Sequence, residues 1–154
     1  MEFSFLVNGL MAALGSDERQ PASATDAVRI GVGDTVIDLL EIPETRELLI
    51  TSRLGMMPQV GADRLREAML RANFVGRAVA RGALSQSDDG GIYLQRVLSL
   101  PQLDVDGLMT ALEAFIAVAV EWAENIARCE AGELIQEEAV SAPPEREPGT
   151  AIWG

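Results

Sequence analysis

The most regular pattern of apolar and polar residues in this chain runs over residues 104–130. Carboxylates lie at its start and Gly132 follows its end, and both are typical of the two ends of a helix. Alternating spacings of three and four place the apolar positions on one face of an α-helix. Those positions are Leu108, Leu112, Phe115, Ala119, Trp122 and Ile126. We therefore predict a long helix that covers the core of a small domain.

Two shorter helices are predicted by the same periodicity. The first spans residues 3–14, with an apolar stripe of Phe3, Leu6, Val7, Leu10 and Leu14. Phe5 and Met11 fall outside the centre of that stripe, so we expect them to leave apolar surface exposed. The second spans residues 62–73 and is too short to be stable without packing against another element.

Five strands separate these helices. Alternating or continuous apolar runs with turn residues between them predict strands at 28–32, 35–42 and 47–53. A second hairpin is predicted from residues 77–85 and 91–99, joined by the turn sequence SQSDDGG. The resulting order is α-βββ-α-ββ-α, an α+β fold in which a twisted antiparallel sheet packs against helices.

The composition changes after Gly132. Residues 133–154 contain five glutamates, three prolines and one arginine, which predicts a solvated segment that contributes little to folding. Its end carries the apolar pair Ile152 and Trp153. We therefore predict one domain over residues 1–132, followed by an acidic tail over residues 133–154.

Composition also excludes most chemistry. The 154 residues carry a net charge of −12 and no histidine, which argues against a nucleic-acid or anionic-lipid binder and removes the commonest acid–base and metal-binding side chain. Gly31-Val32-Gly33 lacks the rest of a dinucleotide fingerprint, and Asp88-Asp89-Gly90-Gly91 lacks the remaining ligands of a calcium loop. We predict no catalytic residue, no cofactor and no metal, and hence no enzyme.

Cellular location is indicated by three features of the sequence. No apolar run reaches transmembrane length, and the apolar N-terminal stretch follows Glu2 rather than the basic residues of a signal peptide. The single cysteine, Cys129, has no partner for an internal disulfide, and we expect it to be a packing residue. These features favour a cytoplasmic protein.

The hairpin over residues 35–53 has apolar residues on both faces. Since the predicted helices cover only one face of a sheet, the other must meet a partner or remain exposed. This surplus of apolar strand surface is typical of a binding module.

The whole arrangement resembles the class I type III secretion chaperones, the Tir chaperone family of small, acidic bacterial proteins. The resemblance covers about residues 1–130 and depends on size, acidity and element order. Its most specific part is the run LREAMLRANFVGRAVARGALSQSDDGGIYLQRVLSL, followed by a proline-containing link and a long helix with EWAENI late in it. It implies a cytoplasmic bacterial homodimer that binds the N-terminal segment of a secreted effector and holds it non-globular without ATP.

Two sets of site residues follow from the pattern and the resemblance. We expect an exposed client-binding patch formed by Phe5, Val28, Ile30, Val36, Leu40 and Leu49. A one-residue error in strand register reverses any such assignment, and the alternative is that these residues are ordinary core. The resemblance places the dimer contact on the second helix, where the residues suited to it are Leu65, Ala68, Met69 and Ala72.

Two alternatives remain open from the sequence. Leu65 and Met69 are equally suited to cover the monomer's own sheet. The chain as a whole also fits a regulatory or assembly adaptor that sequesters a protein partner through a domain of similar topology.

Overall fold

The computed structural model describes residues 2–15, 20, 21, 27–74 and 76–132. The predicted tail, residues 133–154, lies outside this range. The helices are α1 (Phe3–Leu14), α2 (Ala62–Asn73) and α3 (Val105–Glu130), with short 3-10 helices η1 (Arg77–Val79) and η2 (Leu100–Gln102). The strands are β1 (Gln20–Pro21), β2 (Ala27–Val32), β3 (Thr35–Ile42), β4 (Glu47–Met56), β5 (Ala83–Gln86) and β6 (Gly91–Ser99).

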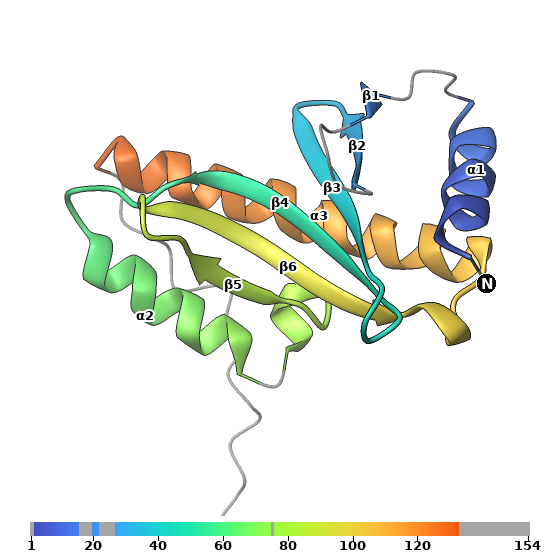
Figure 1. Ribbon diagram of the computed structural model, residues 1–154. Coiled ribbons are helices and arrows are strands. Elements are labelled where there is room, and N and C mark those ends of the chain that lie inside the picture. Colours follow the sequence, from blue (N-terminus) through green and yellow to red (C-terminus); the bar gives the residue numbers. More distant parts are fainter. Residues whose placement is uncertain (1, 16–19, 22–26, 75, 133–154) are drawn as a thin grey trace, which may run out of the picture.

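The strands form one antiparallel sheet in the order β1-β2-β3-β4-β6-β5. Figure 1 shows α3 running along the back of this sheet. Helix α1 lies beside the first turns of α3, and α2 lies alongside β5. The predicted α+β order is confirmed, and the two-residue β1 is an addition that the sequence did not indicate.

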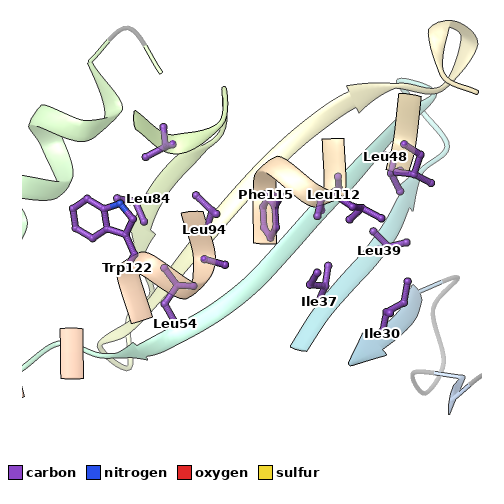
Figure 2. Close-up of a cluster of buried hydrophobic side chains, with 14 of the residues drawn as sticks. Ile30, Ile37, Leu39, Leu48, Leu54, Leu84, Leu94, Leu112, Phe115 and Trp122 are labelled. Atoms are coloured by element: carbon purple, nitrogen blue, oxygen red, sulfur yellow. The ribbon is translucent and has the colours of Figure 1, made fainter. Parts of the chain in front are cut away.

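Helix α3 begins where the sequence predicts. The Asp104 carboxylate accepts a hydrogen bond of 2.7 Å from the Gly107 amide, which satisfies one of the unpaired amides of the first turn. All six residues of its predicted stripe are buried. Figure 2 shows Leu112, Phe115 and Trp122 directed at the sheet.

The core lies between α3 and one face of the sheet. Along β3 and β4, alternate residues are buried, namely Ile37, Leu39, Leu48, Ile50, Ser52 and Leu54. The residues between them are half-buried or exposed, because successive side chains of a strand point to opposite faces. We call the buried side the inner face and the opposite side the outer face.

Two expectations for α1 are wrong. Met11 is buried, and Leu14 is exposed. The buried set continues at Val7, Leu10 and Met11, which is a wider stripe than the one predicted. The helix packs closely on α3 because Gly9 has no side chain: a Cβ there would lie 2.6 Å from Cγ2 of Val105.

The predicted strand over residues 77–85 is also wrong in its first half. The chain forms η1 there, then turns through Ala80 and Arg81, both at positive φ, and becomes extended only at β5. Gly82 permits the close approach to β6, since a Cβ at this residue would lie 2.4 Å from the Gln95 carbonyl oxygen. The turn leaves β5 as a short strand at the sheet edge.

The outer edge of β5 is closed by a side chain. Asn73, the last residue of α2, donates to the Leu84 carbonyl at 3.0 Å and accepts from the Leu84 amide at 2.8 Å. The carboxamide thus takes the place of a neighbouring strand, and it fixes the end of α2 to the sheet. Edge strands that lack such cover are free to pair with other chains.

We predict that Asn73→Ala destabilises the fold by about 2 kcal/mol, because it leaves both Leu84 groups without their partner in a part-buried site. Urea denaturation followed by circular dichroism measures this change. Asn8→Ala, an exposed position on α1, is the matched control and should change stability by no more than about 0.5 kcal/mol. Equal stability of the two variants would show that the carboxamide bonds contribute nothing.

Candidate client-binding surface

An apolar row crosses the outer face of the sheet. Leu40 of β3 lies directly opposite Leu49 of β4, and Leu49 lies directly opposite Val97 of β6. Directly opposed side chains on one face have Cβ atoms about 5 Å apart, so the three form one continuous band. Val97 is 51% exposed, and neither Leu40 nor Leu49 is buried. We call these three residues the outer row.

The rest of the outer face is mixed. Val36, which is 48% exposed, lies opposite Gly31 near the far end of β3. Between Val36 and the outer row, Arg29 and Asp38 form an ion pair with bonds of 2.7 and 3.0 Å. The hydrogen bond to Asp38, followed by its charge, raises the pKa of the exposed Arg29 guanidinium. This face therefore presents an apolar band beside neutralised polar groups.

Three of the six predicted client-binding residues belong to this face, namely Val36, Leu40 and Leu49. Val28 and Ile30 do not, because Val28 lies opposite Leu39 and Ile30 opposite Ile37, both on the inner face. Ile30 is buried and Val28 is partly buried against the core. The assignment of these two residues is wrong because side chains alternate between the two faces of a strand. Val28 and Ile30 share a face with the core residues and not with Val36.

Phe5 is exposed, at 59%, but it is not part of the outer row. It belongs to α1, which packs against α3 rather than on the outer face. The structure therefore does not bring Phe5 together with Leu40 and Leu49. Val97 is the member that the sequence analysis missed, and the alternation of Tyr93, Gln95 and Val97 with buried Ile92 and Leu94 is the signal that identifies its face.

The predicted dimer residues of α2 are largely internal. Leu65, Met69 and Ala72 are buried within the single chain, and Ala68 is half-buried. The burial of Leu65 and Met69 agrees with the alternative interpretation, in which they cover the monomer's own core. The opposite side of α2 instead exposes Leu70 at 71% and the following Phe74 at 81%. We call Leu70 and Phe74 the α2 patch.

Charge is distributed unevenly over the chain. Residues 53–96 carry seven arginines and four carboxylates, a net charge of +3, whereas the remaining residues carry five arginines and twenty carboxylates, a net charge of −15. Burial and the neighbouring Arg81 charge lower the pKa of Arg96. Among the described residues, neither of these two arginines has a carboxylate within ion-pair distance.

Reactive side chains are sparse in the described part of the chain. No group of three or more Asp, Glu or Cys side chains there is arranged to hold a metal ion. Cys129 is buried and free, and burial raises the pKa of its thiol, which favours the unreactive neutral form. It therefore packs in the core, as the sequence predicts. Among the described helices, none combines the length and hydropathy that a bilayer-spanning helix needs.

A small α+β domain with an uncovered sheet face and exposed apolar residues has the architecture of a protein-binding module. The chain belongs to the Tir chaperone protein (CesT) family, whose sequence profile matches residues 6–123. This assignment confirms the predicted family, and with it the prediction of a chaperone rather than an enzyme. No curated protein sequence is significantly similar to the chain.

Solved structures show the same fold. A chain of the HopA1–SchA chaperone–effector complex has a TM-score of 0.65 at 13% identity, covering 79% of this chain and 93% of that one. A chain of the complex of Yersinia pestis type III secretion chaperone SycH with a YscM2 fragment has a TM-score of 0.62 at 21% identity, covering 78% and 98%. A chain of the Pseudomonas aeruginosa ExoT–SpcS complex has a TM-score of 0.56 at 22% identity, covering 79% and 98%.

We predict that glutamate is tolerated at Leu49 and not at the adjacent Ile50. A carboxylate at Leu49 reaches solvent from the outer face, so its cost should be about 1 kcal/mol. A carboxylate at the fully buried Ile50 lacks a partner and should cost several kcal/mol, a large part of a domain's total stability. Thermal unfolding followed by circular dichroism distinguishes them. If Leu49→Glu unfolds the protein and Ile50→Glu does not, the two faces are assigned the wrong way round.

Proposed function

We propose that this protein is a type III secretion chaperone of the bacterial cytoplasm, which binds the N-terminal segment of a secreted effector and holds it non-globular. The observation that carries the proposal is the uncovered outer face, where the outer row is continuous across three strands. An extended client segment that covers such a row removes the apolar side chains of the chaperone from water. The client does not have to fold in order to do so.

The energy for this binding comes from surface burial. Apolar area removed from water contributes roughly 25 cal/mol per Å², and part of that gain is lost in ordering the client chain. Binding of this kind needs no ATP, since the client is held by contacts that form spontaneously. The result is reversible retention rather than active unfolding.

The solved relatives support this function. SchA is seen in a chaperone–effector complex with HopA1, and SpcS is seen in complex with ExoT. By family and fold, the chain is suited to a client of the same class.

We further propose that the functional unit is a homodimer formed through the α2 patch. Leu70 lies on the exposed side of α2 and Phe74 directly follows the end of the helix, and their high exposure is unusual for large apolar side chains. A two-fold axis beside α2 would place the patch of one copy against that of the other, as an isologous contact requires. The buried Leu65, Met69 and Ala72 then hold α2 against the core of its own chain. Ala68, which is half-buried, lies on the same helix.

The client proposal predicts that Leu49→Glu with Val97→Glu weakens effector binding about tenfold or more, a loss of about 1.4 kcal/mol. The client is first identified by co-expression with N-terminal fragments of proteins encoded beside this gene, and affinity is then measured by calorimetry. The matched control is Val120→Glu, an exposed apolar position on α3. Unchanged affinity in a folded double variant would remove the outer row from the client site.

The dimer proposal predicts that Leu70→Asp with Phe74→Asp gives a folded monomer, because four carboxylates would oppose one another across the two-fold axis. Light scattering should then give the single-chain mass of 16.5 kDa rather than twice that value. Leu65→Asp should instead unfold the chain, since Leu65 is internal. A double variant that retains the dimer mass would place the interface elsewhere.

A further inference from the structure

The acidic tail begins close to α2. Helix α3 ends at Glu130, and its last turns lie against the end of β4: a Cβ on Gly55 would be 3.0 Å from Cγ2 of Ile126. Figure 1 shows this end of α3 beside the connection that leads from β4 into α2. Residues 133–154 therefore start at the side of the molecule where α2 starts, and they continue for twenty-two residues.

The length of the tail is sufficient to reach any part of α2. A chain of this length has a root-mean-square end-to-end distance of about 25 Å if flexible and a maximum span of about 70 Å. Helix α2 has twelve residues and is about 18 Å long. Ile152 and Trp153, near the end of the tail, are thus within reach of the α2 patch.

Two arginines near the C-terminal end of α2 have the charge opposite to that of the tail. The Arg81 amide donates to the Gly76 carbonyl at 2.7 Å, two residues beyond Phe74, so Arg81 lies at the same end of α2. Arg81 and Arg96 interact as like charges. The tail carries five glutamates and one arginine, a net charge of −4. It is an acidic segment in reach of the basic region of an otherwise acidic protein.

We propose that the acidic tail binds the α2 patch of its own chain, with Ile152 and Trp153 on Leu70 and Phe74 and the tail glutamates beside Arg81 and Arg96. Apolar residues at the tip of the tail then meet apolar residues of the patch, and the two regions of opposite charge lie together. Attachment to the same chain gives the tail a local concentration of about millimolar, so a weak contact suffices for occupancy.

The consequence is a self-masked interface. Only the effect of tail binding on dimerisation rests on the proposed dimer. The tail and a second copy compete for Leu70 and Phe74, so tail binding lowers the apparent dimer affinity. The tail contact itself is a property of the single chain. It involves few residues, so we expect it to add little to the stability of the domain.

The test uses Trp153 as a reporter in the full-length chain. The protein has two tryptophans, Trp122 on α3 and Trp153 in the tail, so Trp122→Phe leaves Trp153 alone. At dilutions where the chain is monomeric, Trp153 should show blue-shifted emission and protection from acrylamide. Leu70→Ser with Phe74→Ser should abolish both effects, and the matched outer-face variant Leu49→Ser with Val97→Ser should preserve them.

A second measurement covers the case in which Trp122→Phe does not fold. Fluorotryptophan incorporated into the unsubstituted chain gives one fluorine resonance for each tryptophan, and Trp153→Phe assigns the tail signal. A Trp153 as accessible as a free peptide in the monomer would overturn the proposal. So would protection that is lost in the outer-face variant and kept in the Leu70 and Phe74 variant, since the tail would then occupy the client face.

Competition is tested by replacing the five tail glutamates, Glu133, Glu137, Glu138, Glu145 and Glu147, with glutamine. This variant should expose Trp153 and lower the dimer dissociation constant several-fold in sedimentation equilibrium, because the second copy no longer displaces a bound tail. An unchanged dissociation constant would contradict the competition. A chain that is monomeric at every concentration refutes the dimer instead, and leaves the tail contact to be decided by Trp153 alone.

Discussion

The structure depends on one constraint: the sheet has two faces, and the helices of the described residues cover only the inner one. Phe115 and Trp122 of α3 pack on inner-face residues such as Leu94 and Leu54, and this burial supplies most of the stabilising apolar contact. Because side chains alternate along a strand, the residues on the inner face determine which residues lie on the outer face. Leu40 and Leu49 are directed outward because Leu39 and Ile50 are directed inward. The surface that we assign to the client is therefore a geometric consequence of the core.

The sheet edges are less available than its outer face. Asn73 holds both outward-facing backbone groups of Leu84 on β5, and β1 pairs with part of β2 at the other edge. The pairing of β3 with β4 ends at Asp38 and Thr51, and beyond this point the Ser52 hydroxyl donates to the Val36 carbonyl at 2.7 Å. These contacts limit pairing of strands from other chains. They favour a client bound mainly by side-chain burial over the outer face.

Sequence periodicity predicts the order of the main helices and strands, but it does not locate the site. The bounds of α1 and α2 follow from apolar spacing, and the start of α3 follows also from its capping residue Asp104, because spacing and capping are local properties of the chain. The error over residues 77–85 arose at Gly82, whose close approach to Gln95 is a contact between distant residues. Val28 and Ile30 were misplaced for a related reason. In a hairpin that is apolar on both faces, only the pairing with Ile37 and Leu39 shows which face is inside.

The same reasoning explains why three of the four expected dimer residues of α2 are internal. A helix of three turns needs its apolar stripe for its own domain, since it is not stable alone. Leu65 and Met69 form that stripe, so they are the residues least able to serve a partner. An apolar residue off the stripe, such as Leu70, gains nothing from the monomer's core. On a short helix, exposed apolar residues opposite the buried stripe are therefore the better indication of an interface.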